Sequence, residues 1–260
     1  MIDAPKFSLI TVSYNSEKTI LDSISSVLSQ TYTDFELIII DGSSSDKTLE
    51  IIKQFEDQRI KLISESDKGI YDGMNKGLAL SNGEIIGFLN SDDMLNSQNT
   101  LGTIFNNFHS DIDCTFGDVL IVDDLKLKNP RRHYSSANFE LDFFKYLIMP
   151  PHPSFYFRRK HLNLVKNFDL DFPMSSDFDF VLRCLYKHNL KYRYINETIV
   201  IMSDGGFSNS GFQALIQKNY ESIKSLKKNN IKFNPLNLIS KFFYRLKEIN
   251  RAKKYSIKNG

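Results

Sequence analysis

Hydrophobic and polar positions in the first part of the chain follow two alternating patterns. Short apolar runs, each typical of a buried strand, cover residues 7–13, 35–40, 59–63 and 85–89. Between these runs, apolar side chains recur at helical spacing over residues 17–30, from residue 46 onward, and over residues 69–80. Strands that alternate with helices predict a mainly parallel sheet with right-handed crossovers. We therefore expect an α/β fold in which helices flank a central sheet.

The pattern is less regular after residue 110. Strands are expected over residues 114–123, 124–129, 154–157 and 192–202. Helices are expected over residues 139–147, 177–188 and 213–228, with a last helix after Pro235. The α/β domain would then cover residues 1–215, and residues 216–260 would form a helical appendage.

Composition limits the class of protein. Of the 260 residues, 41% are hydrophobic, so the chain can bury a sizeable core and is not disordered. Cys114 and Cys184 lie far apart, which favours a reducing compartment over a secreted disulfide framework. Residues 1–6 lead straight into a strand without the pattern of a signal peptide, and no apolar run is long enough to span a membrane. A cytoplasmic protein is expected.

Charge is distributed unevenly along the chain. Residues 218–260 hold 12 Lys or Arg and two acidic residues, whereas residues 1–217 hold 21 Lys or Arg and 29 acidic residues. The basic segment also carries apolar residues near one stripe of a helix, from Leu236 to Ile249. Residues 235–260 would either lie on an anionic membrane surface or pack on the domain with their lysines in water.

Acidic residues directly follow two of the predicted strands. Asp92 and Asp93 come after the strand at residues 85–89, and Asp41 follows the strand at residues 35–40. Open α/β sheets bind ligands at the edge formed by the carboxyl ends of their strands. Carboxylates there suit a hard divalent cation that holds a diphosphate. Two plainer interpretations are a solvated acidic turn at Asp92 and Asp93, and an Asx turn at Asp41.

Three further positions are candidates for binding or catalysis. Asp67 lies in a polar, Gly-containing stretch between a strand and a helix, where it would contact a nucleotide or cap the helix. Asp177 lies where a helix begins, and it would act as a general base, as an N-cap, or as both. His152, between prolines, would line a cleft or fill a structural position.

Four segments occur together at the strand ends. They are residues 11–15 (TVSYN), 41–48 (DGSSSDKT), 67–72 (DKGIYD) and 88–93 (FLNSDD). In this order and spacing they resemble family 2 glycosyltransferases with the GT-A fold. The resemblance is dense over residues 7–95 and continues more loosely, through Asp118, His152 and residues 176–179, to about residue 210. Members with the Gly-Ile-Tyr-Asp stretch often build bacterial O-antigen or capsule repeat units.

The resemblance implies a role for each candidate residue. The nucleotide-binding residues would be Thr11, Tyr14, Asn15, Asp41, Asp67 and Asp92, with Asp41 reading a base that we expect to be uracil. Asp93 would bind Mn²⁺ or Mg²⁺. Many members have Asp-x-Asp where this chain has two adjacent acids, so the division of roles between Asp92 and Asp93 is left open.

The resemblance also implies a catalytic base and an acceptor side. Asp177 matches the family's base, but Ser176 precedes it where the family has Glu, which leaves Asp179 as a rival. Asp118, His152 and Arg132 would approach the acceptor or a phosphate.

These roles imply an inverting, metal-dependent transferase. It would move a sugar from a nucleotide diphosphate sugar, expected to be a UDP-sugar, to a saccharide acceptor on a polyprenyl diphosphate lipid. Residues 1–95 would form the nucleotide half and residues 96–215 the acceptor half, at the inner face of the cell membrane and with no nucleic-acid partner.

Two other functions compete with this one. A nucleotidyltransferase would normally show a Gly-rich, basic phosphate loop near the N-terminus, and residues 7–13 are not followed by one. A non-catalytic carbohydrate-binding module would not need acids clustered at strand ends. A Gly-rich dinucleotide fingerprint is also missing, which disfavours a dehydrogenase.

Overall fold

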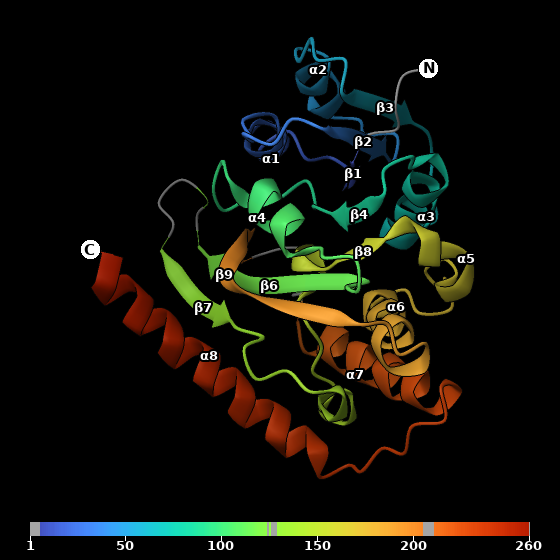
Figure 1. The fold of residues 1–260 in the computed structure, drawn as a ribbon, viewed down its shortest axis with the longest axis vertical. Helices are drawn as coiled ribbons and strands as arrows, with labels where there is room; N and C mark the ends of the chain where they lie inside the picture. Colours follow the sequence, from blue (N-terminus) through green and yellow to red (C-terminus); the bar gives the residue numbers. More distant parts are fainter. Residues whose placement is uncertain (1–5, 124, 126–128, 205–210, 260) are drawn as a thin grey trace.

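The computed structural model describes residues 6–259, without residues 124, 126–128 and 205–210, and it has an α/β fold (Figure 1). One nine-stranded sheet runs through the molecule in the order β3-β2-β1-β4-β8-β6-β9-β5, and β7 pairs with β6 beside this path. Helices lie on both faces of the sheet, which confirms the predicted fold class.

The first half of the sheet is parallel, as the sequence predicts. Its strands are β1 (Phe7–Ser13), β2 (Phe35–Asp41), β3 (Ile60–Ser64) and β4 (Ile85–Phe88). The helices between them are α1 (Ile20–Leu28), α2 (Thr48–Ile52) and α3 (Ile70–Leu80). Every residue of β1 and β2 is buried because helices cover both faces, which explains their continuous apolar runs. The register pairs Ser13 with Asp41, so the two strands end together.

The second half of the sheet is mixed. Its strands are β5 (Asp93–Leu95), β6 (Cys114–Val122), β7 (Pro130–Tyr134), β8 (Tyr156–Arg158) and β9 (Tyr192–Ser203). The pair formed by β6 and β9 is parallel, whereas β8 runs antiparallel to both β4 and β6, and β5 and β7 are also antiparallel to their partners. The short strand β8 therefore joins the parallel half to the mixed half.

The structure departs from the sequence pattern where an element depends on a distant partner. Most of the strand predicted over residues 124–129 falls outside the described residues, and the segment that pairs with β6 is the polar strand β7. The predicted helix at residues 139–147 is a 3-10 helix, η1 (Leu141–Tyr146). Neither β5 nor α4 (Thr100–Asn107) was predicted.

Several shorter elements lie between β7 and β9 in the chain. They are the 3-10 helices η2 (His152–Ser154) and η3 (Arg159–His161), the helices α5 (Leu162–Val165) and α6 (Ser176–Leu182), and the π-helical turn η4 (Arg183–Lys187). The helix predicted over residues 177–188 is therefore formed, but its second half widens into the π-helical turn.

The hydrophobic core lies in two layers, one on each face of the sheet. Successive residues of a strand point to opposite faces, so Ile38 belongs to one layer and Ile39 to the other. One layer packs against α3, α6 and α7, and the other packs against α1, α2 and α4. The sheet is thereby held rigid at the edge where β1, β2 and β4 end.

Two long helices follow the sheet. They are α7 (Gly211–Lys228), which packs on α6, and α8 (Asn237–Asn259), which runs along β7 at the edge of the molecule (Figure 1). Arg132 of β7 forms a 2.6 Å ion pair with Glu248 of α8, and the Tyr244 hydroxyl donates to the carbonyl of Ser135. The tail therefore packs on the domain. Across the described residues, each helix is too short or too polar to cross a bilayer.

Candidate active site

The loops that follow β1, β2 and β4 are tied together at the carboxyl edge of the sheet. The backbone N–H of Asn15 donates to Ser44 Oγ (2.8 Å), and its side-chain oxygen accepts from the backbone N–H of Ser45 (2.9 Å). Asn15 has a left-handed backbone conformation (φ 49°), which asparagine tolerates better than most residues. Ser16 Oγ lies 2.8 Å from Ser91 Oγ and so links the first loop to the acidic motif. The loops after β1, β2 and β4 thus form one continuous edge.

Tyr14, Gly42 and Asp67 lie close together at this edge. A Cβ atom added to Gly42 would lie 2.8 Å from Asp67 Oδ2 and 3.5 Å from the Tyr14 ring. Tyr14 is 65% exposed, so its ring is available to a ligand, while Asp67 Oδ1 accepts from the Gly69 backbone N–H. An open aromatic ring beside a carboxylate can stack on a base and accept from its N–H groups. Gly42 was not predicted as a site residue, although it lies in the segment at residues 41–48.

Asp41 and Thr11 lie beneath this surface. Asp41 is fully buried, and its carboxylate accepts hydrogen bonds from Ser13 Oγ (3.2 Å), Ser64 Oγ (2.8 Å) and both the backbone N–H (2.9 Å) and hydroxyl of Ser44. The Ser44 backbone bond is local, as in the plainer interpretation of Asp41, but it is made three residues along the chain, where an Asx turn would use two. Thr11 is buried within β1. Asp41 thus shapes the loop that follows β2, and a direct contact of Asp41 or Thr11 with the nucleotide stays a prediction.

The acidic motif presents one buried and one accessible carboxylate. Asp93 is 1% exposed, and its Oδ2 accepts from the Asn90 side-chain amide (3.0 Å). Its Oδ1 is buried without a hydrogen-bond partner among the described residues. Burial raises the pKa of Asp93 well above its usual value, the neighbouring Asp92 raises it further, and burial also raises the pKa of the less buried Asp92.

Asp92 and Asp93 suit a divalent cation that takes its other ligands from phosphate and water. A buried carboxylate oxygen without a hydrogen-bond partner is what a cation ligand looks like when no cation is present. Over the part of the chain that the structure describes, no three His, Cys, Asp or Glu side chains gather as a complete metal site. Mg²⁺ is commonly bound by one or two carboxylates together with phosphates and water. Asp92 and Asp93 have the chemistry of such a carboxylate pair.

Asp177 lies at the first turn of α6 and is hydrogen-bonded to a residue of α3. Its Oδ1 accepts from the Tyr71 hydroxyl of α3 (3.0 Å) and from the backbone N–H of Phe178 (2.8 Å). Burial, together with the charge of Asp177, raises the pKa of Tyr71 well above 10, so this hydroxyl stays a donor. Asp177 itself is only partly buried. Part of this side chain is therefore open to solvent.

Asp179 has a different environment. It is 1% exposed, and its carboxylate accepts from Arg183 Nε (2.7 Å), Ser225 Oγ (2.7 Å) and the Asn229 amide (3.3 Å). These bonds join α6 to η4 and α7. Asp179 thus has the geometry of a structural residue, and the contacts favour Asp177 over its rival as the base.

The surroundings of Asp177 include three basic groups. His152 is buried and stacks on Phe88, with ring centroids 4.9 Å apart, and its Nε2 has no hydrogen-bond partner among the described residues. Burial lowers the pKa of His152 to about 4, so the ring is neutral at pH 7 and can offer a hydrogen bond but no charge to a phosphate. The charges of Lys218 and Lys241 also act on this region.

Sequence reasoning missed Tyr71 and the two lysines. Tyr71 lies in the quoted Gly-Ile-Tyr-Asp stretch, which could have pointed to it. Lys218 and Lys241 belong to α7 and α8, and the Nζ of Lys241 donates to Asn219 Oδ1 (2.8 Å). Nothing in the local sequence marks these lysines, because only the packing of the two helices brings them near Asp177.

Asp118 and Arg132 are held in a different cluster. Asp118 Oδ1 accepts from the Ser136 backbone N–H and the Tyr194 hydroxyl (both 2.9 Å), and its Oδ2 lies 3.1 Å from His133 Nε2. Arg132 is paired with Glu248 of α8. Both residues therefore connect β6 and β7 to β9 and α8, and a contact of either with the acceptor or a phosphate stays a prediction.

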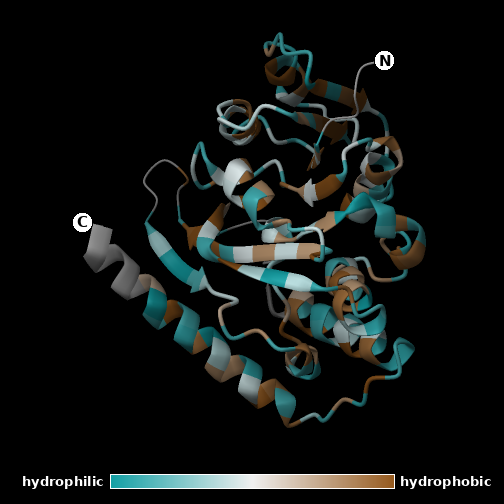
Figure 2. Ribbon diagram, viewed as in Figure 1, coloured by the Kyte–Doolittle hydropathy of each residue, from teal (hydrophilic) through white to brown (hydrophobic). Residues whose placement is uncertain are grey.

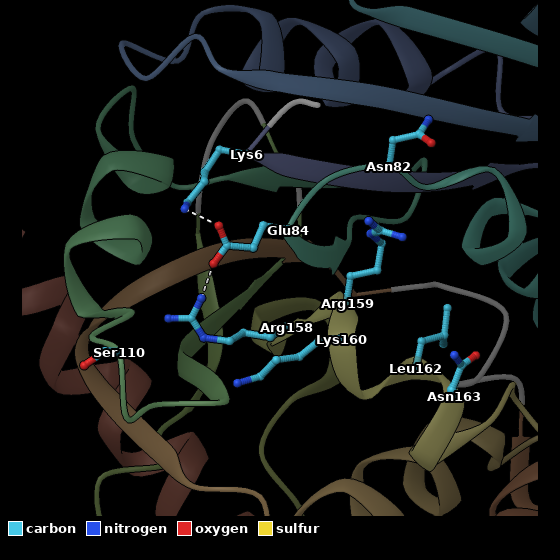
Figure 3. A pocket seen from close by; sticks show the side chains of 9 residues that line it. All are labelled: Lys6, Asn82, Glu84, Ser110, Arg158, Arg159, Lys160, Leu162 and Asn163. Atoms are coloured by element: carbon cyan, nitrogen blue, oxygen red, sulfur yellow. Dashed lines mark hydrogen bonds and ion pairs between the residues drawn. The ribbon is translucent and has the colours of Figure 1, made fainter. Parts of the chain in front are cut away.

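A separate basic hollow of about 790 Å³ lies at the opposite edge of the sheet (Figure 3). Glu84 directly precedes β4, and Figure 3 shows it between Lys6 and Arg158. Glu84 forms ion pairs with both of these residues. Arg159 and Lys160 also line this hollow. The amino ends of β1 and β4 form this edge, so the hollow is not part of the site at their carboxyl ends.

Sequence comparisons agree with this geometry. The family model described as Glycosyl transferase family 2 matches residues 8–167. A PGL/p-HBAD biosynthesis glycosyltransferase from Mycobacterium bovis is 30% identical over 213 residues, which cover 80% of each protein. A UDP-Glc:alpha-D-GlcNAc-diphosphoundecaprenol beta-1,3-glucosyltransferase from Escherichia coli is 48% identical over 88 residues, which cover 34% of this chain and 35% of that protein.

Two solved structures share the fold. Residues 1–349 of Staphylococcus aureus TarS superpose with a TM-score of 0.63 at 21% identity, covering 87% of this chain and 67% of that one. The mannosyltransferase PcManGT from Pyrobaculum calidifontis, solved with GDP-Man and Mn²⁺, superposes with a TM-score of 0.62 at 16% identity, covering 100% of this chain and 77% of that one. The family match over more than half of the chain, together with the relative matched over 80% of both proteins, shows that this protein is a glycosyltransferase of family 2 with the GT-A fold.

Proposed function

We propose that the protein transfers a sugar from a UDP-sugar to a saccharide on a lipid diphosphate, with inversion at the anomeric carbon, during synthesis of a bacterial surface polysaccharide. The Escherichia coli relative is named for a UDP-Glc donor and a diphosphoundecaprenol acceptor, and TarS has been solved with UDP-GlcNAc. The hydrogen bond from Tyr71 to Asp177 carries the proposal, because it brings the candidate base to the nucleotide motif. Neither a nucleotidyltransferase nor a binding module has support in the family match.

The donor would lie across the carboxyl edge of β1, β2 and β4. Tyr14 would stack on the base, and Asp67 Oδ2, which faces Gly42 beside the Tyr14 ring, would accept from an N–H group of the base or from ribose. Asn15 and Asp41 would keep the two loops in place through their hydrogen bonds. Residues 1–95 would then be the nucleotide half, and residues 96–215 would carry the acceptor side.

Transfer would proceed by a single displacement. As the acceptor oxygen forms its bond to the anomeric carbon, the bond from that carbon to the diphosphate oxygen breaks. Asp177 takes the proton of the acceptor hydroxyl, and the nucleoside diphosphate leaves with the electron pair. The Tyr71 hydroxyl and the Phe178 N–H hold Asp177 in one orientation, so the base is positioned before the acceptor arrives. His152 Nε2 would offer a hydrogen bond to a sugar hydroxyl beside it.

Asp92 and Asp93 would hold Mn²⁺ or Mg²⁺ together with the donor diphosphate. When bound, the cation would neutralise the charge that develops on the departing diphosphate. Asp92 and Asp93 lie between the end of β4 and the start of β5, so the cation would be held by the nucleotide half, whereas Asp177 comes from α6. Asp92 and Asp93 would thus act on the leaving group, and Asp177 would act on the acceptor.

The test compares Asp177→Asn with Asp171→Asn, an exposed acid on the preceding loop. We expect Asp177→Asn to lower kcat by about 10²–10⁴-fold, the usual contribution of a general base, while UDP binding stays within about twofold. Asp171→Asn should leave both unchanged. Turnover by Asp177→Asn at the wild-type rate would reject the assignment, and an NMR assay of the product anomer would test inversion.

A further inference from the structure

Large apolar side chains of the first half of α8 face outward. Phe242 and Phe243 are 62% and 57% exposed. The other exposed large apolar residues of this stretch are Leu236, Leu238, Ile239 and Leu246. A surface helix normally buries its apolar stripe against the domain. This helix does the opposite, and Figure 2 shows hydrophobic and hydrophilic segments alternating along α8 at the edge of the molecule.

Polar contacts determine which face of α8 lies inward. Glu248 is 3% exposed and pairs with Arg132 at 2.6 Å. The Tyr244 hydroxyl donates to the Ser135 carbonyl, and Lys241 donates to Asn219. These contacts lie on three successive turns, so they set the rotation of the helix. The outward direction of the apolar stripe follows from them.

The exposed charge around this stripe is positive. Glu221 and Glu248 are the only acidic residues in residues 218–260, and both are buried and hydrogen-bonded within the protein. Arg245 and Lys247 are exposed beside the apolar stripe. Lys232, on the connection to α8, is also exposed. An identical copy would meet this surface with like charge, which disfavours self-association through it.

A groove adjoins the stripe. It has a volume of about 370 Å³ and lies between η1 and α8. Its lining is mostly aromatic and apolar, and consists of Phe143, Tyr146, Ile148, Phe243 and Tyr244, with Ser240 and Lys247. Phe243 belongs to both the groove and the stripe, so the two form one apolar surface with a cationic border.

We propose that this surface binds an anionic lipid bilayer, with the stripe and groove in the interfacial region and Arg245 and Lys247 at the headgroups. Apolar burial combined with attraction to anionic lipid is how amphipathic helices lie in a membrane interface. The proposal deepens the proposed function, because an acceptor on a lipid diphosphate is presented at a bilayer. Docking along α8 would hold the enzyme where that acceptor is found.

The experiment measures flotation of the full chain with phosphatidylcholine vesicles that contain or lack phosphatidylglycerol, without substrates. We expect binding to the anionic vesicles that weakens at high salt. Phe242→Ser with Phe243→Ser should weaken it by about tenfold or more, since both rings would leave the interface. Arg245→Gln should weaken it by about fivefold. The matched control is Leu21→Ser with Leu164→Ser, two exposed apolar residues on α1 and α5, which should bind as the wild type does.

Equal binding by the wild type and the Phe242, Phe243 variant would overturn the proposal, as would absence of wild-type binding. Light scattering provides the second arm. A dimer that the same variant dissociates, without vesicle binding, would assign the surface to a second copy and overturn the proposal. Vesicle binding without any sugar transfer would reject the proposed function alone, whereas transfer to a detergent-solubilised acceptor without vesicle binding would reject the docking surface alone.

Discussion

Replacement of Asp179 by asparagine tests which carboxylate of α6, Asp177 or Asp179, is the general base. The buried carboxylate of Asp179 accepts from Arg183, Ser225 and Asn229. Asparagine keeps the shape but removes the charge, and Arg183 then faces a neutral amide. We expect the protein to lose stability but to keep its chemistry, because none of these bonds reaches the proposed substrate site.

The size of the loss follows from the contacts. Removal of one partner of a buried ion pair costs about 3–5 kcal/mol. Arg183 also donates to the carbonyls of Val165 and Asn167, which keep part of its hydrogen bonding. We therefore expect the lower end, about 3 kcal/mol, which lowers the melting temperature by about 6–12 °C in a chain of this size.

The assay combines urea denaturation with turnover per folded molecule. For Asp179→Asn, the denaturation midpoint should fall with an unchanged slope, and kcat at low temperature should stay within about threefold of the wild type. For Asp177→Asn, we expect the reverse, with stability within about 1 kcal/mol and kcat strongly reduced. Full stability combined with lost turnover in Asp179→Asn would refute this reasoning and identify Asp179 as the base.

Three further results are expected. Asp93→Asn should weaken Mn²⁺ binding to the UDP complex by about tenfold or more, measured by calorimetry, and a larger effect of Asp92→Asn would assign the cation to Asp92. Gly42→Ala should weaken UDP binding by about tenfold, because its Cβ would lie 2.8 Å from Asp67 Oδ2 and displace that carboxylate; unchanged affinity would contradict the proposed base site. Burial lowers the pKa of Lys241 to about 8, below its unfolded value, so its protonated form destabilises the fold below pH 8 and this penalty is relieved as the pH rises toward about 10. Lys241→Met should therefore raise the free energy of unfolding at neutral pH by about 1–2 kcal/mol, and a gain that does not shrink at alkaline pH would disprove this explanation.

Local patterns were sufficient for the first half of the fold. The strands β1 to β4 and their connecting helices follow from hydrophobic periodicity, because each apolar run or helical stripe lies within a short stretch of the chain. The strand β7 has the polar sequence PRRHY and no such pattern, and it forms because β6 and α8 lie on either side of it. The strand β5 has only three residues, too few to show any period.

The candidate site also has features that local sequence predicts and features that depend on distant contacts. The motifs at residues 11–15, 41–48, 67–72 and 88–93 predicted one binding edge, and hydrogen bonds such as that from Asn15 to Ser44 bring the first two of them together. The contact of Tyr71 with Asp177 spans 106 residues of sequence, so no local spacing could show it. The pairing of Arg132 with Glu248 could not be seen either, since the two residues are 116 positions apart.

The sequence by itself determined the alternation of strands and helices, the acids at the strand ends and the amphipathic character of the tail, because these depend on residues that are near one another in the chain. Only the tertiary structure decided that Asp177 stays accessible while Asp179 is enclosed, and that α8 turns its polar face inward. Both outcomes depend on which distant groups pair in the interior, and a buried charge must find its partner wherever the fold places it.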